Sequence, residues 1–185
     1  MRIINNIIMK RYVLTLVLAL ASLSAFCQNT IKFLGIPIEG TKKEMIAKLQ
    51  AKGYEYNSYS DELTGEFNGQ NVTISVQTVN NRVWRLAIID NHGRDEADIK
   101  IRFNNLLDQF ANNAKYQKVD GTRLTDADDI SFQMTVKNKR YEAVFSFVDK
   151  SINGYVWYMI AEQYGRYKIA MFYENHDNAA NGDDL

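Results

Sequence analysis

Cysteine, proline and histidine are scarce in this chain of 185 residues, which has one Cys, one Pro and two His. The cysteine is Cys27, and it lies in a segment that we expect to be removed. A chain without cysteine forms no disulfide, so packing alone must stabilise its fold. It also has no thiol nucleophile and no thiolate ligand for a metal, which excludes the reactions that depend on them.

Neither sign of charge predominates, because 22 Lys and Arg residues stand against 22 Asp and Glu residues. Binding to the phosphate backbone of nucleic acids needs an excess of basic side chains, so we expect no nucleic-acid partner. The ten glycines are scattered, so they build no phosphate-binding loop. A Gly-x-Ser-x-Gly motif of hydrolases is missing as well. We therefore expect a non-catalytic protein without a cofactor.

The first 27 residues have the features of a secretory signal peptide. Arg2, Lys10 and Arg11 form a basic start, and residues 12–26 follow without a charge. This apolar run is shorter than the ~20 residues that a membrane-spanning helix needs. Removal of residues 1–27 leaves 19 basic against 22 acidic residues, a net charge of −3 over 158 residues.

The predicted cleavage site lies between Cys27 and Gln28, with Ala25 and Cys27 as its small residues. The protein is then periplasmic or secreted and has no membrane span. The alternative is a lipoprotein anchored through Cys27, which the large Phe26 directly before the cysteine disfavours.

Two helices are predicted from capping and periodic signals. Thr41 and Glu44 form a capping box, and Gly53 is a C-terminal glycine for the first helix. The second helix covers residues 94–112, where apolar residues recur at spacings of four, three and four. Its apolar stripe consists of Ile99, Phe103, Leu106 and Phe110.

Alternation of apolar and polar residues predicts an antiparallel sheet. Asn68-Gly69 and Asn80-Asn81 are predicted turns between strands. After a first strand that begins at Leu63, the predicted strands are 72–76, 83–89, 116–119, 131–136, 141–148, 155–162 and 166–173. In the predicted strand 131–136 we expect Phe132, Met134 and Val136 to share a core face.

The two halves of the chain have a similar pattern. Residues 85–89 match residues 168–172, and an acidic-Asn-His triplet follows each segment. Each half is predicted to be a helix followed by an antiparallel β-meander. Two such units most simply build one antiparallel sheet with both helices on one face. We therefore predict a single α+β domain over 28–175, with half-repeats at about 30–92 and 93–175 and a flexible tail at 176–185.

This order of elements resembles the β-lactamase-inhibitor-protein-like fold. The resemblance covers most of residues 30–174 and implies a long curved sheet whose concave face grips a partner protein. It departs from that family in cysteine, because the inhibitors carry paired cysteines and residues 28–185 have none.

Several clusters of His and acidic residues resemble metal sites, but we expect that none of them binds a metal ion. His92 and His176 could approach Asp90, Glu174 and Asp177, yet no close His-x-x-x-His spacing supplies a zinc set. The loop with Asp120, Asp126, Asp128 and Asp129 begins like a calcium loop and lacks its later glycine and glutamate. We assign these carboxylates, together with Asp61-Glu62 and Asp95-Glu96-x-Asp98, to caps and turns.

Aromatic residues are the strongest functional signal. Residues 155–160 are apolar on both faces, so one large aromatic side chain must point away from the helices. Aromatic and Arg side chains dominate binding hot spots. The predicted partner-binding residues on this outer face are Arg85, Trp157, Tyr158, Lys168 and Phe172. Either Tyr158 or Trp157 points outward, and the other then belongs to the core.

From this surface we expect a binding module for an envelope or extracellular protein. The first alternative is a glycan-binding module that uses the same aromatic rings as stacking platforms. The second is a small enzyme with an unrecognised site built from His92, Asp90 and the loop around Asp126.

Overall fold

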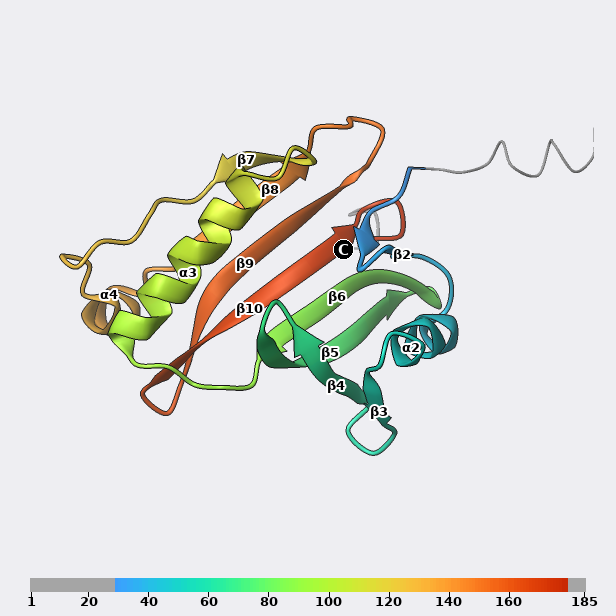
Figure 1. The fold of residues 1–185 in the computed structure, drawn as a ribbon, viewed down its shortest axis with the longest axis horizontal. Helices are drawn as coiled ribbons and strands as arrows, with labels where there is room; N and C mark the ends of the chain where they lie inside the picture. The colour runs from blue at the N-terminus through green and yellow to red at the C-terminus, as the bar shows by residue number, and fades with distance from the viewer. Residues whose placement is uncertain (1–28, 180–185) are drawn as a thin grey trace, which may run out of the picture.

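The computed structural model describes residues 29–179, in which helices cover one face of an eight-stranded antiparallel sheet (Figure 1). The helices are α2 (Lys42–Gln50), α3 (Glu96–Ala111) and α4 (Ile130–Lys137). The strands are β1 (Lys32–Phe33), β2 (Ile36–Pro37), β3 (Glu55–Asn57), β4 (Glu62–Phe67), β5 (Gln70–Val79), β6 (Arg82–Asp90), β7 (Tyr116–Asp120), β8 (Glu142–Phe147), β9 (Gly154–Gln163) and β10 (Arg166–Asn175). The predicted α+β class with an antiparallel sheet is confirmed.

The two halves of the chain meet at the centre of one continuous sheet. Its strand order is β3-β4-β5-β6-β10-β9-β8-β7, while β1 and β2 form a separate two-stranded hairpin. The two segments of similar sequence are antiparallel neighbours here, with Ile88 opposite Met171 and Ala87 opposite Phe172. Each half contributes a helix and four strands of this sheet; the first half adds the β1–β2 hairpin, and the second half adds α4. That the halves are repeats of one unit stays a prediction.

Local signals place α2, α3 and the tight turns correctly. The capping box of α2 is present, since Thr41 Oγ1 accepts from Glu44 N and Glu44 Oε2 accepts from Thr41 N. Asp95 caps α3, whose whole predicted apolar stripe is buried. Asn68 and Gly69 both have positive φ, 52° and 68°, as a two-residue hairpin turn requires.

The segment predicted as a strand at 131–136 is the helix α4, so that prediction is wrong. Asp129 caps it, and Glu96 on α3 accepts from the backbone N–H groups of Ile130 at 2.9 Å and Ser131 at 3.3 Å. Of the three side chains expected in the core, Phe132 is 46% exposed and Val136 is 58% exposed. Met134 is partly buried and packs against the core. The alternation of apolar residues is real, but these tertiary hydrogen bonds override it.

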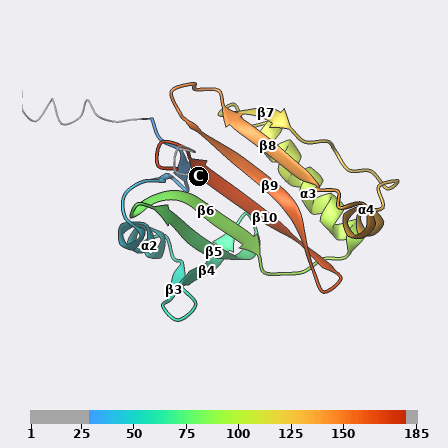
Figure 2. The ribbon, with the colours of Figure 1, turned by 180° about the vertical axis from the view of Figure 1, so that it is seen from behind.

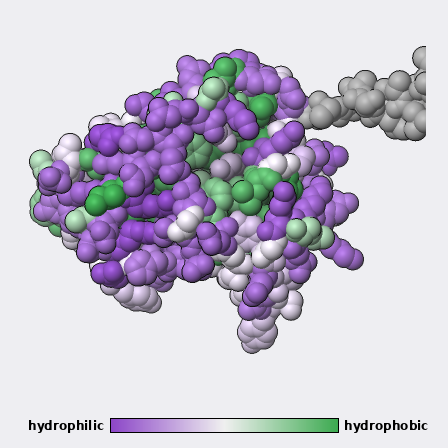
Figure 3. All heavy atoms as spheres, viewed as in Figure 1, coloured by the Kyte–Doolittle hydropathy of each residue, from purple (hydrophilic) through white to green (hydrophobic). Residues whose placement is uncertain are grey.

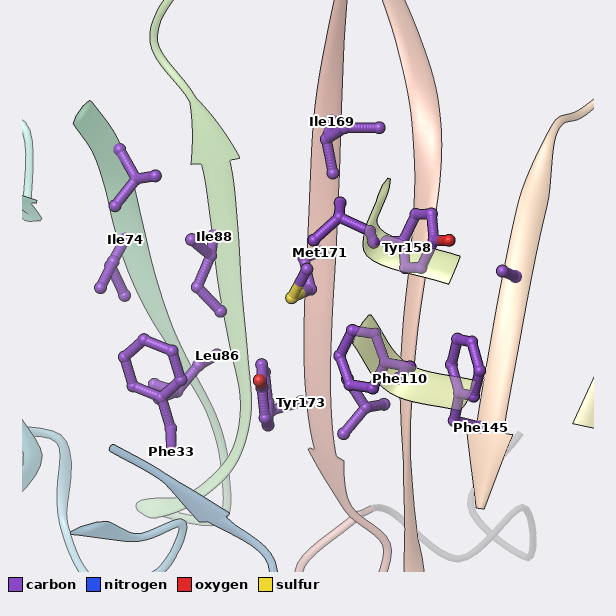
Figure 4. Packing of buried hydrophobic residues seen from close by; sticks show 14 of the residues in the cluster. Phe33, Ile74, Leu86, Ile88, Phe110, Phe145, Tyr158, Ile169, Met171 and Tyr173 are labelled. Carbon is purple, nitrogen blue, oxygen red and sulfur yellow. The ribbon is translucent and has the colours of Figure 1, made fainter. Parts of the chain in front are cut away.

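The core lies between the sheet and the helices (Figure 4). On the side of β8 and β9, Tyr158 lies beside Phe110 and Phe145 (Figure 4), with centroid distances of 6.1 and 6.2 Å. On the other side, Phe33 packs against Tyr173 of β10 at a centroid distance of 5.1 Å. The hairpin β1–β2 is thereby joined to the central strand pair.

The predicted signal peptide, including Cys27, and the end of the predicted tail lie outside the described residues. The first part of that tail is hydrogen-bonded to the sheet. His176 N donates to Asn153 O at 3.0 Å, and Asn178 Nδ2 donates to Val83 O at 2.9 Å. None of the helices within residues 29–179 is long and apolar enough to cross a membrane.

Candidate functional site

The sheet face opposite α2 and α3 carries aligned rows of side chains, and Figure 2 views the sheet from this side. The strand register places Val144, Trp157, Phe172 and Ala87 in one row across β8, β9, β10 and β6. A second row contains Tyr155, Glu174 and Arg85, and a third contains Met159, Ala170 and Ile89. We call this surface the open face; it comprises Trp84, Arg85, Ala87, Ile89, Val144, Tyr155, Trp157, Met159, Lys168, Ala170, Phe172 and Glu174.

A β-bulge in β6 brings Trp84 onto the open face. The register changes from Gln77 opposite Arg85 to Thr78 opposite Val83, which leaves Trp84 as the extra residue. Val83 is therefore buried in the core, and Trp84 lies next to Arg85. The Arg85 guanidinium carbon is 4.0 Å from the Trp84 ring centroid, a cation–π distance.

Glu174 holds this cluster together with a carboxylate that is largely buried. Its Oε1 lies 2.6 Å from Arg85 Nη2 and accepts from Trp157 Nε1 at 2.7 Å. Its Oε2 lies 3.0 Å from His176 Nε2. Burial by itself raises the pKa of Glu174, but the hydrogen bonds from His176 and Trp157 and the charge of Arg85 outweigh it. The pKa of Glu174 is therefore below its usual value, and the group is an anion at neutral pH.

The aromatic rings of the open face are fixed rather than loosely exposed. Trp157 and Phe172 stack with their ring centroids 4.1 Å apart and their planes 21° from parallel. The Arg85 guanidinium carbon is 5.4 Å from the Phe172 centroid, so the cation sits between Trp84 and Phe172. Tyr155 is 37% exposed beside this cluster. Such held aromatic and Arg side chains lose little conformational entropy when a partner binds.

The structure brings together three of the five predicted partner-binding residues. Arg85, Trp157 and Phe172 are in mutual contact through Glu174 and the ring stack. Lys168 lies on the same face, four residues before Phe172 along β10 and towards its other end.

Tyr158 does not belong to the open face, so its assignment as a partner-binding residue is wrong. Its side chain is fully buried on the helix side, and its hydroxyl donates to Phe103 O of α3 at 3.0 Å. Its ring centroid lies 4.9 Å from that of Phe103. The register with Trp157 outward and Tyr158 in the core is the one that the sheet adopts.

Three further members of this surface were not predicted from the sequence: Trp84, Tyr155 and Glu174. Simple alternation along β10 from Phe172 is enough to place Glu174 there. For Trp84 no such signal exists, because alternation from Arg85 would put it on the core side and only the bulge reverses that.

The two histidines considered for zinc lie at opposite ends of the antiparallel pair β6–β10, because each follows the end of its own strand. Asp90 accepts from Arg94 Nη1 at 2.9 Å and from Arg102 Nε at 3.2 Å, so its carboxylate is already occupied. In the acidic loop, Asp128 accepts from Thr125, and Asp129 caps α4. Among residues 29–179 there is no group of three or more His, Cys, Asp and Glu side chains that could hold a metal ion.

No protein-family model, no curated protein and no solved structure matches this chain. The geometry of the open face is therefore the basis on which a function can be inferred.

Proposed function

We propose that this protein is an exported, non-catalytic binding module that recognises a protein partner in the cell envelope through the open face. The observation that carries this proposal is the cluster of Trp84, Arg85, Trp157 and Phe172 on a sheet face that no helix within residues 29–179 covers. Trp, Tyr and Arg are the residues most enriched in the energetic centres of protein interfaces.

The shape of the surface supports a macromolecular partner. Four cavities of the described chain, with volumes from 430 to 660 Å³, are lined by residues outside the open face. Small ligands bind in concave sites, whereas the open face presents rows of side chains across several strands. The element order that resembles the β-lactamase-inhibitor-protein-like fold supports the same role, because that fold grips its partner with a sheet face.

Glycan binding is the alternative, and the ring contacts leave at most one face of each Trp ring for a sugar. Sugar recognition by stacking needs a free aromatic face. One face of the Trp84 ring is covered by Arg85, and one face of the Trp157 ring is covered by Phe172. If glycans are the ligands nevertheless, millimolar saccharide should quench the fluorescence of these two tryptophans, which are the only ones in the chain.

Site-specific photocrosslinking in cells tests the proposed function. We expect a photoreactive amino acid at Tyr155, at the margin of the cluster, to form a discrete adduct with one envelope protein. The matched control is Ile101, which is 58% exposed on α3, away from the open face. Trp157→Ala and Phe172→Ala should each abolish the Tyr155 adduct. The same adduct from Ile101, or an adduct that survives both substitutions, would contradict the proposal.

A further inference from the structure

A second surface, on the helix side of the sheet, has the properties of a ligand site. A cleft of about 660 Å³ lies between the β1–β2 hairpin and the neighbouring ends of β7 and β8. In Figure 3 apolar residues gather in a recess on this side of the molecule. Its volume is in the range of small-molecule sites, about 300–1,000 Å³. We call it the hairpin cleft.

The lining of the hairpin cleft is mainly apolar and is attached to the core. Phe67 packs on Phe33 with a centroid distance of 4.9 Å, and Tyr116 packs on Phe147 at 5.2 Å. Leu34 also lines the cleft and remains 42% exposed. Its φ of 51° is unusual for leucine, so the hairpin turn holds an apolar side chain at the cleft in a strained backbone conformation.

The charged residues of the cleft favour an anionic group. Lys32 and Lys115 both line it, and neither takes part in an ion pair among residues 29–179. The carboxylate that lines it, Asp149, accepts from Asn29 Nδ2 at 2.9 Å and from Ser151 Oγ at 2.7 Å. These hydrogen bonds, with that of Ser151 foremost, lower the pKa of Asp149. Two lysines without carboxylate partners thus border an apolar floor.

We propose that the hairpin cleft binds a medium-chain alkyl carboxylate, with the alkyl chain against Phe67 and Tyr116 and the carboxylate near Lys32 and Lys115. The apolar lining accounts for the chain, and the lysines account for the charge of the head group. This site lies on the opposite side of the sheet from the open face, so it is independent of the proposed function.

Direct titration of the purified chain with a fluorescent undecanoate probe tests this proposal. We expect saturable binding that dodecanoate displaces. The double charge reversal Lys32→Glu with Lys115→Glu should weaken binding tenfold or more. The matched control reverses two exposed lysines elsewhere, Lys43→Glu with Lys52→Glu, and should change binding less than twofold. Circular dichroism of both variants verifies that they are folded.

Several outcomes would overturn the proposal. They are the absence of saturable binding, an equal loss in the control variant, and binding of dodecylamine as tight as that of dodecanoate. Displacement of the probe by an apolar peptide but not by dodecanoate would assign the cleft to a protein segment instead. A dimer in sedimentation that the Lys32 and Lys115 reversals dissociate would assign it to a second copy. Trp157→Ala should leave probe binding unchanged, which separates this test from that of the open face.

Discussion

At the scale of single residues, neighbours in one strand serve opposite faces of the sheet. Tyr158 fills the core under α3, while Trp157 stacks on Phe172 and donates to Glu174 on the open face. Tyr158 is therefore more deeply buried than Trp157, and its substitution should lower the free energy of unfolding more.

Tyr158→Ala should lower the free energy of unfolding by about 3–5 kcal/mol, because it removes a fully buried ring and leaves a cavity. Tyr158→Phe should lower it by only about 1 kcal/mol, the contribution of the hydrogen bond to Phe103. Trp157→Ala should lose less than half as much as Tyr158→Ala, because that ring is only partly buried. Urea denaturation of the three variants measures these values, and a larger loss at Trp157 would contradict the register.

Glu174 should make stability depend on pH. Its pKa is lowered in the folded protein from the usual value of 4.5, so its contribution is present above pH 4.5 and is lost as the pH falls through the folded pKa. The free energy of unfolding of the wild type should therefore exceed that of Glu174→Gln at pH 7, and the two should converge as the pH falls below 4.5 and through the folded pKa of Glu174.

Thermal unfolding across this pH range measures the difference between the two proteins. Glu55→Gln makes the same change of charge on exposed β3 and serves as the control. A gap between wild type and Glu174→Gln that stays constant from pH 7 to below the usual pKa would argue against the depressed pKa.

At the scale of elements, a buried ionic cluster ties the end of β6 to the start of α3. Asp90 lies between Arg94 and Arg102, and all three are largely buried. Arg102 Nη1 also donates to Asn68 Oδ1 at 3.2 Å, and this hydrogen bond connects the β4–β5 turn to the cluster. The crossover from the first half of the chain to the second is thereby fixed.

Asp90→Ala should lower the free energy of unfolding by about 3–5 kcal/mol, because it leaves two buried guanidinium groups without their anion. Asp108→Ala breaks the exposed pair with Arg123 and should lower it by about 1 kcal/mol or less. Chemical denaturation distinguishes them, and equal losses would mean that the buried cluster contributes no more than a surface ion pair.

The elements also show how far sequence can predict this fold. Helices α2 and α3 follow from caps and stripes that lie within the helices themselves. Helix α4 does not, because its first N–H groups are satisfied by Glu96, 34 residues away, and its end depends on Asn138 at a φ of 51°.

The open face is predicted in outline from the sequence, since Arg85, Trp157 and Phe172 follow from alternation. The bulge at Trp84 and the burial of Tyr158 depend on the register between neighbouring strands. The sequence of a single strand that is apolar on both faces does not determine this register.

At the scale of the whole molecule, the two halves depend on each other for burial. The central pair β6–β10 is shared, and Tyr173 in β10 packs on Phe33 from the first half. The hairpin cleft likewise uses Phe67 from the first half and Tyr116 from the second. Neither half can bury its apolar face fully without the other.

We therefore expect the two halves to unfold together, and the two tryptophans allow a direct measurement. In Trp157→Phe the remaining fluorescence comes from Trp84 in β6, and in Trp84→Phe it comes from Trp157 in β9. For each variant, urea denaturation followed by its own tryptophan and by far-ultraviolet circular dichroism should give coincident midpoints, as cooperative unfolding requires. A tryptophan midpoint displaced from the dichroism midpoint in either variant would show that one half unfolds first. Asp90→Ala in each of the two variants tests whether the buried ionic cluster couples the halves. Without Asp90 the contact between β6 and α3 is weakened, so midpoints that coincide with Asp90 present should separate.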